Sequence, residues 1–414
     1  MKITIVTQYY PPEPIPIPQA VARGLAERGH EVSVVTGFPN YPQGALYEGY
    51  RQRFGHAEKD GSIRIFRVPL VISHSNNPVG RLLNYLTFAA SSFAAHRSVR
   101  QADVVYAYAT QMTAAIGPAW WNRIWKLPFV MHVQDLWPES VTGSSMVGNP
   151  RVQKVVAKIL EPWLRRLYRD AAATIAIGPG MSKLLVERGV PAERAHTIFN
   201  WAETNQLAID RSRRAANLSQ RSLNVTYAGN IGDMQDLETV VKAAALVTDL
   251  VGFKISVVGS GVAEARVKAL AQTEGATNVH FYGRVPFEQM ATHYEASDFQ
   301  LVTLKDLDIF RVTIPSKLQS SLAVGIPVIT TVAGDVEKIV TEESLGFVSP
   351  PGDAAALADT FRLAFNASSD DRRRMGDNAQ RFYKEAMSRD SGVDAIEQIL
   401  ASVSSDTKKR KSHG

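Results

Sequence analysis

The chain has 414 residues, and its 45% hydrophobic content is enough for two or three domains with sizeable cores. The net charge is +6, but the run Lys408 to Lys411 supplies four of these charges, so the remainder is only mildly basic and nucleic-acid binding is not indicated. The chain contains no cysteine, which excludes disulfides, thiol catalysis and zinc–cysteine sites.

The first residues, Met1 to Val6, open directly into an apolar strand without a leader segment. No apolar run approaches the roughly 18 residues that a membrane span needs. We therefore expect a soluble, cytoplasmic protein.

The amino-terminal region has the pattern of a βαβ unit, the opening of a doubly wound α/β sheet. A strand over Lys2 to Thr7, a helix over Gln19 to Arg28 and a strand over Glu31 to Thr36 are expected. Each strand is followed by a loop rich in Pro and Tyr, Tyr9 to Pro18 and Gly37 to Tyr50. Such loops form the ligand crevice of α/β sheets, so their residues either stiffen the loop or contact a substrate.

Three features further along combine apolar, aromatic and basic residues. They are a helix over Leu82 to Arg100, a cluster of Trp120, Trp121 and Trp125, and a helix over Arg151 to Arg169 with one apolar stripe and an opposite basic face. The last helix is either a core helix with a solvated basic face or a surface that docks to anionic lipid. Interfacial tryptophans would favour the second interpretation.

Between these features, an apolar strand from Phe129 runs into His132, Gln134 and Asp135. The carboxyl end of a strand is where α/β sheets place their chemistry. We expect His132 or Asp135 to contact a substrate, although the sequence does not decide whether they share one side of the loop.

The second half of the chain restarts the strand–turn–helix pattern after a polar segment, Leu207 to Arg221, which is the expected interdomain linker. Strands over Asn224 to Ala228, Lys254 to Val258 and His280 to Tyr282 each end in glycine, at Gly229, Gly259 and Gly283. A final helix over Ser391 to Val403 and a disordered basic tail from Ser404 complete the prediction.

The segment Ile314 to Thr331 (IPSKLQSSLAVGIPVITT) predicts a loop, a short amphipathic helix ending at Gly325, and a buried parallel strand. A helix N-terminus carries free N–H groups and about half a positive charge, which suits a diphosphate. Lys317 in the first turn adds a full positive charge.

Several of these segments resemble the family 4 glycosyltransferases, in particular the fucosamine-transferase-like enzymes of bacterial O-antigen and capsule assembly. The similar stretches are YYPPE, RGHEVSVVTGFPNYPQG, YEGY, HVQDLWPES, IFNWA and PSKLQ…LAVGIPVI. The resemblance implies a GT-B fold, in which two Rossmann-like domains face a cleft and a C-terminal helix crosses back to the first domain. Residues 1–205 with helix 387–403 would form the acceptor-side domain, 206–386 the nucleotide-sugar domain, and 404–414 the tail.

The resemblance also implies a retaining transfer of sugar from a nucleotide-sugar, UDP rather than GDP, to a lipid-linked saccharide. The partners would be these two substrates and an anionic membrane surface at the inner face of the cell membrane, with no nucleic acid and no cofactor beyond the donor. We expect donor contacts from Gly229, Asn230, Gly259, Arg284, Pro315, Ser316, Lys317 and Leu318, and substrate contacts from Glu13, Asn40, Tyr41 and Gln134. The expected catalytic residues are His132, Asp135 and Lys317.

The sequence departs from the family at the donor site. Val312 and Ser320 hold the places of two glutamates, and Asn230 and Gln235 those of an Arg and a Lys. Positive charge against the diphosphate must then come from Lys317, with Arg284, Lys305 or Arg311 as further candidates.

Two other functions remain open, and one metal motif is set aside. A nucleotide-sugar 2-epimerase shares this two-domain build, and the missing glutamates also allow a non-catalytic sugar-nucleotide binder. Asp306-Leu307-Asp308 matches a metal-binding triplet of the other large glycosyltransferase fold, but it falls in the second Rossmann-like half. We expect no metal there.

Overall fold

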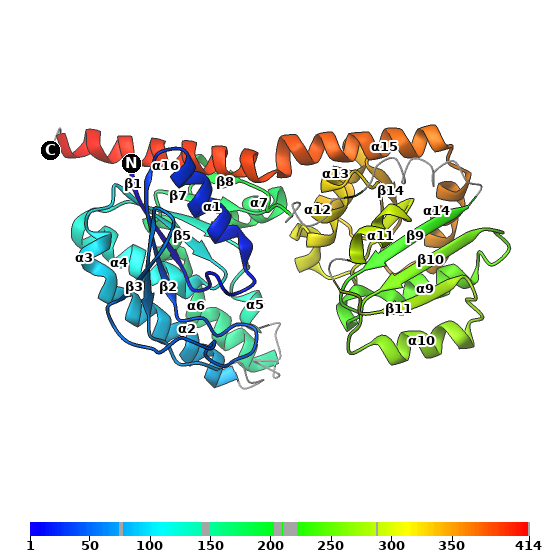
Figure 1. Ribbon diagram of the computed structural model, residues 1–414, viewed down its shortest axis with the longest axis horizontal. Helices are drawn as coiled ribbons and strands as arrows, with labels where there is room; N and C mark the ends of the chain where they lie inside the picture. The colour runs from blue at the N-terminus through cyan, green and yellow to red at the C-terminus, as the bar shows by residue number, and fades with distance from the viewer. Residues whose placement is uncertain (74–77, 143–149, 203–208, 210–221, 287–288, 413–414) are drawn as a thin grey trace. The chain divides into compact units, whose positions relative to one another are not determined.

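The computed structural model describes residues 1–73, 78–142, 150–202, 209, 222–286 and 289–412 (Figure 1). The chain divides into two compact units: unit 1 is Met1–Phe199 with Arg389–Gly414, and unit 2 is Asn200–Ser388. Both are α/β, as predicted. The linker predicted between them lies outside the described residues, apart from Ile209.

Unit 1 is built on an eight-stranded sheet of described residues with the order β3-β4-β2-β1-β5-β6-β7-β8. Its strands are β1 (Lys2–Thr7), β2 (Glu31–Gly37), β3 (His56–Asp60), β4 (Ile63–Val68), β5 (Val104–Ala109), β6 (Phe129–Val133), β7 (Ala173–Ala176) and β8 (Ala195–Thr197). All neighbours pair in parallel except β3 with β4. The central strands are apolar and fully buried, as in a sheet covered on both faces.

The helices of unit 1 are α1 (Pro16–Glu27), α2 (Pro78–Ser92), α3 (His96–Val99), α4 (Ile116–Trp125), α5 (Glu139–Thr142), α6 (Pro150–Asp170), α7 (Pro179–Glu187) and α16 (Arg389–Ser412). Two differ from the prediction. Helix α1 starts earlier than Gln19, because prolines fit the first helical turn. The helix expected over Leu82 to Arg100 is interrupted by a 3-10 turn at Phe93–Ala95. No helix in the described part of the chain has both the length and the apolar content of a membrane span.

Unit 2 has a six-stranded parallel sheet of described residues in the order β11-β10-β9-β12-β13-β14, the strand order of a dinucleotide-binding fold. Its strands are β9 (Leu223–Ala228), β10 (Phe253–Val258), β11 (Val279–Gly283), β12 (Phe299–Val302), β13 (Val328–Thr330) and β14 (Gly346–Val348). Its helices are α9 (Leu237–Ala245), α10 (Glu264–Thr273), α11 (Met290–Glu295), α12 (Ser316–Ala323), α13 (Asp335–Glu342), α14 (Ala354–Asn366) and α15 (Ser369–Phe382), followed by a π-helical turn at Tyr383–Met387. In such sheets the ligand crevice lies at the carboxyl ends of the strands, where the order reverses between β9 and β12.

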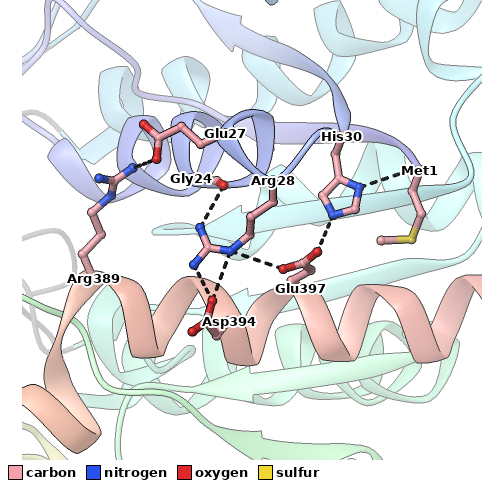
Figure 2. A network of polar contacts seen from close by, with 8 residues as sticks. All are labelled: Met1, Gly24, Glu27, Arg28, His30, Arg389, Asp394 and Glu397. Atoms are coloured by element: carbon pink, nitrogen blue, oxygen red, sulfur yellow. Dashed lines mark hydrogen bonds and ion pairs between the residues drawn. The ribbon is translucent and has the colours of Figure 1, made fainter.

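Helix α16 returns the end of the chain to unit 1, where it packs against α1, β5 and β6. Its apolar stripe of Val393, Ile396 and Leu400 is fully buried. Figure 2 shows the polar contacts beside this stripe: Arg28 with Asp394 and Glu397, His30 with Glu397 and the amino terminus, and Arg389 with Glu27. Exposed ion pairs contribute only about 0–1 kcal/mol each, so the apolar stripe carries most of the docking energy.

The tail expected to be disordered from Ser404 is helical to Ser412, so that prediction is wrong for the described part of the tail. The tail is rich in Lys and Arg, which are good helix formers and interact favourably with the negative end of a helix. The polar composition alone therefore did not indicate disorder.

Close approach of α1 and α16 predicts that Gly24→Val destabilises unit 1. A Cβ at position 24 would lie 2.9 Å from Cγ1 of Val393. Overpacking of this kind costs about 1–3 kcal/mol, which should lower the melting temperature by a few degrees. The second substitution Val393→Ala should restore part of the loss; an unchanged melting temperature in Gly24→Val would contradict the close contact.

Candidate active site

Three strand–helix turns of unit 2 form a glycine-lined edge at the carboxyl ends of β9, β10 and β11. The N–H of Gly229 donates to Val258 (2.8 Å), and the N–H of Gly259 donates to Gly283 (2.8 Å). A Cβ at position 259 would lie 1.8 Å from the carbonyl oxygen of Gly229, and both residues have positive φ. Only glycine permits this packing, which leaves backbone rather than side chains at the edge.

Lys317 lies against this edge, as the second residue of α12. Its Nζ is 4.8 Å from the ring centroid of Tyr227, and its Cε occupies the space beside Gly229, 2.7 Å from where a Cβ would be. Burial lowers the pKa of Lys317 to about 8. The structure therefore brings together Gly229, Gly259 and Lys317, three of the predicted donor-site residues, and adds Tyr227, which the sequence analysis missed.

The N-terminus of α12 presents its first amides without a side-chain cap. The N-cap residue is Pro315, whose side chain has no acceptor; its carbonyl accepts the N–H of Leu318 (3.0 Å). The exposed Ser316 follows, and both the helix end and the Lys317 ammonium are suited to an anion. Leu318, also expected at the donor, is instead fully buried and anchors the helix, because α12 needs an apolar face towards the core.

The remaining candidate cations of unit 2 are placed differently. Arg311 pairs with Asp306 (2.8 Å), so its charge is used within its own turn. Arg284 is exposed directly after β11, and Asn230 is exposed with its amide 3.4 Å from Gln235. Among the residues that the structure describes, no three His, Asp or Glu side chains form a cluster suited to a metal ion.

In unit 1, the two predicted catalytic residues lie in different environments at the end of β6. His132 lies within the strand, is fully buried, and its Nδ1 is 2.5 Å from the hydroxyl of Tyr106. Burial lowers its pKa to about 3, so the imidazole is neutral at physiological pH. Asp135 reaches solvent, but the protein groups packed around it desolvate its carboxylate and raise its pKa to about 6.

Direct substrate contact by His132 is therefore not supported, since β6 is covered on both faces and its side chain does not reach the surface. Its Nε2 is buried and has no hydrogen-bond partner among the described residues. Asp135 is accessible and ionised at neutral pH, with Gln134 almost buried beside it. Of the pair, only Asp135 is accessible to a substrate, and its role stays a prediction.

The loops after β1 and β2 are joined by Glu13, which is 3% exposed. Its Oε1 accepts the N–H groups of Asn40 and Tyr41 (both 2.9 Å), and its Oε2 accepts the N–H of Tyr10 (3.1 Å). Burial raises the pKa of the Glu13 carboxyl, and the three hydrogen bonds from the backbone act in the opposite direction and lower it. Glu13 therefore acts as a structural clamp.

The other two residues expected to contact substrate in these loops, Asn40 and Tyr41, differ in their accessibility. Asn40 is fully buried and donates to the carbonyl of Phe38 (2.9 Å). Tyr41 is partly exposed and stacks on Tyr9, with ring centroids 5.2 Å apart. The expectation of substrate contact is thus not supported for Glu13 and Asn40, because their polar atoms hold the loops, and it stays a prediction for Tyr41.

A buried network that the sequence analysis missed lies beside this clamp. The Nε2 of Gln8 donates to Oδ1 of Asn84 (2.5 Å), and the Nε2 of Gln111 donates to Oε1 of Gln8. Asn84 also donates to the carbonyl of Val71 (2.8 Å). Gln8 directly follows β1, and this position at a strand end was the only feature of the sequence that could have indicated the network. The network ties α2 to the carboxyl edge of the sheet.

Comparisons with known proteins agree with the division of the chain into two units. Residues 17–201 match the model of the glycosyl transferase 4-like domain, and residues 208–382 match that of glycosyl transferases group 1. A curated relative, named as the colanic acid biosynthesis glycosyl transferase WcaI of Escherichia coli, is 28% identical over 336 residues, 78% of this chain and 82% of its own.

Solved structures extend the likeness to the whole fold. Sucrose-phosphate synthase from Thermosynechococcus elongatus matches 97% of this chain and 99% of its own with a TM-score of 0.70 and 17% identity. Anabaena HepE, solved in complex with UDP, matches 97% of this chain and 100% of its own with a TM-score of 0.64 and 16% identity. At these identities the structural likeness concerns the fold.

The clamp predicts that Glu13→Gln destabilises unit 1 without weakening nucleotide binding by unit 2. The amide replaces one carboxylate oxygen by an NH₂ group that cannot accept, so at least one backbone N–H loses its partner, which costs about 1.5–3 kcal/mol. Thermal unfolding and calorimetry with UDP would measure the two effects. Unchanged stability together with lost acceptor use would instead return Glu13 to the substrate site.

Proposed function

The chain belongs to the family 4 glycosyltransferases, and from this premise we propose that it transfers a sugar from a UDP-sugar to a lipid-linked saccharide, with retention of configuration, during assembly of a bacterial cell-surface polysaccharide. The observation that carries the donor assignment is Lys317 at the uncapped N-terminus of α12, against the glycine edge. UDP as the nucleotide is supported by the HepE structure, and the polysaccharide pathway by the name of the E. coli relative.

The donor half of the mechanism is electrostatic. As the bond between the anomeric carbon and the diphosphate oxygen breaks, its electron pair moves to the diphosphate. The α12 amides and the Lys317 ammonium stabilise this growing negative charge. Neither Val312 nor Ser320, which hold the places of the family's two glutamates, supplies a carboxylate, so Lys317 carries a larger share of donor binding here.

The acceptor half rests on unit 1. The acceptor hydroxyl forms the new bond to the anomeric carbon and must lose its proton. Asp135 is exposed at the carboxyl end of β6 and is ionised above about pH 6, so it is suited to orient that hydroxyl or to receive its proton. Buried His132 supports the strand that holds Asp135, through its contact with Tyr106.

The lowered pKa of Lys317 predicts a pH dependence of UDP binding. Above about pH 8 the ammonium of the free protein loses its proton, so UDP affinity should fall as pH rises through this value. Lys317→Ala should remove the dependence and lower the turnover about 30-fold or more, which corresponds to about 2–4 kcal/mol. Lys317→Arg is the matched control, because it keeps its charge over the whole range. Calorimetric titrations of UDP at several pH values test this; identical profiles for wild type and Lys317→Ala would exclude Lys317 from the diphosphate site.

Activity is tested by incubation of the protein with UDP- and GDP-sugars, with and without a polyprenyl-diphosphate-linked saccharide. Acceptor-dependent release of UDP is expected, and chelation of divalent metals should not abolish it, since Asp306 is paired with Arg311. In the same assay Asp135→Asn should lower turnover at least about tenfold while UDP affinity stays within about twofold. Acceptor-independent isomerisation of the sugar would indicate an epimerase, and UDP binding without turnover would indicate a binding protein.

A further inference from the structure

Unit 1 exposes large apolar side chains on two helices. On α2 these are Val79, Leu82, Leu83 and Leu86, and on the first half of α6 they are Val152, Val155 and Ile159. Val79 is 61% exposed and Ile159 68% exposed, values unusual for aliphatic residues that repeat along a helix. We call these seven residues the docking face.

The two parts of the docking face belong to neighbouring helices. Tyr85 of α2 and Trp163 of α6 both pack against Trp137, with ring centroids 6.4 and 6.3 Å apart. Figure 1 shows α2 and α6 on the same side of unit 1. The two groups of exposed side chains therefore belong to helices that share a packing partner in unit 1.

The exposed large apolar side chains of α6 are confined to its first half, while Leu164 and Leu167 of the second half are buried in unit 1. At 100° per residue, the partly buried Leu160 lies on the side of Leu164 and Leu167, whereas Val155 and Ile159 lie on the edge of the apolar stripe that faces solvent. This exposed edge is not required for packing, so its apolar residues point to an interaction outside the unit.

Basic residues flank the exposed stripe of α6. Lys154 and Lys158 are both exposed, and at 100° per residue they lie in the arc beside Val155 and Ile159. The exposed Arg165 and Arg169 continue this basic side along the helix, and the exposed Arg166 follows Ile159 two turns further along the apolar line. An apolar line beside a line of Lys and Arg is the chemistry of a helix that lies in a membrane interface.

We propose that the docking face binds unit 1 to an anionic bilayer, with its aliphatic side chains between the lipid headgroups and its lysines on lipid phosphates. This rests on the proposed function, in which the acceptor stays in the membrane. A second copy of the chain fits the face less well, because a symmetric interface would bring the two basic lines together.

The tryptophans that the sequence suggested for insertion do not form this face. Trp121 is fully buried, and Trp125 is half-buried against Trp120 at 5.9 Å, whereas Trp120 itself is 42% exposed on α4. Within the docking face, insertion falls to the aliphatic residues. Asn84 fixes α2 to the carboxyl edge of the sheet through Gln8, so docking would bring the acceptor edge of unit 1 to the membrane in a defined orientation.

Vesicle sedimentation of the full chain tests the proposal with two matched pairs of variants. Val155→Ser/Ile159→Ser removes exposed apolar groups from the face, and Val251→Ser/Val262→Ser removes still more exposed ones from unit 2. Lys154→Gln/Lys158→Gln and Lys242→Gln/Lys254→Gln form the corresponding pair for exposed charges. The vesicles contain phosphatidylcholine with or without phosphatidylglycerol, at low and high salt.

The wild type should sediment with phosphatidylglycerol vesicles at low salt and be released by salt. Each docking-face variant should lower the partition coefficient about tenfold or more, whereas each control should stay within about twofold. A wild type that remains in the supernatant overturns the proposal. So does an equal loss in the controls, or a wild-type dimer that the docking-face variants dissociate without any vesicle binding.

Calorimetry with UDP in the absence of vesicles separates this proposal from the proposed function. Docking-face variants that bind UDP with wild-type affinity but do not sediment locate the defect in the membrane surface alone. A wild type that sediments but does not bind UDP would support the docking face and contradict the proposed donor.

Discussion

The proposed donor site of unit 2 depends on a single amine held in a partly desolvated position. Lys317 lies over the ring of Tyr227 and beside a backbone that carries no side chain at Gly229. Burial makes the ammonium less stable than in water, which is why its pKa falls to about 8. A bound diphosphate would supply the missing negative charge and reverse this loss. Pairing with this poorly solvated ammonium would therefore favour diphosphate binding.

The glycine edge is what makes this position possible. Gly259 packs on the carbonyl of Gly229 at a distance that no Cβ allows, so no side chain from these two positions covers the turns after β9 and β10. Lys317 fills the space that a side chain at position 229 would otherwise take. The three βα turns and the start of α12 are therefore one interdependent arrangement, although 88 residues separate Gly229 from Lys317.

Local periodicity predicted the α/β class, several of the strands and the α12 segment, and the family resemblance placed Gly229 and Lys317 at one donor site. They did not predict which polar side chains remain accessible. Glu13 was expected to contact a substrate, but three backbone N–H groups from two loops converge on it, and that convergence depends on tertiary packing. The burial of His132 was not predicted for a related reason, since a strand covered on both faces buries every residue, polar or not.

Helix α6 shows the same limit of sequence patterns for apolar residues, and here the limit bears on function. Periodicity identifies an apolar stripe but not the partner that covers it, so the stripe was expected to be either core or lipid-facing along its full length. The structure assigns Leu164 and Leu167 to the core and leaves Val155 and Ile159 exposed. Such exposed aliphatic residues add less to folding stability than core residues, because they bury only part of their area within the unit. Measurements of stability are consequently less sensitive to them, whereas an assay that supplies a second surface can detect what they do.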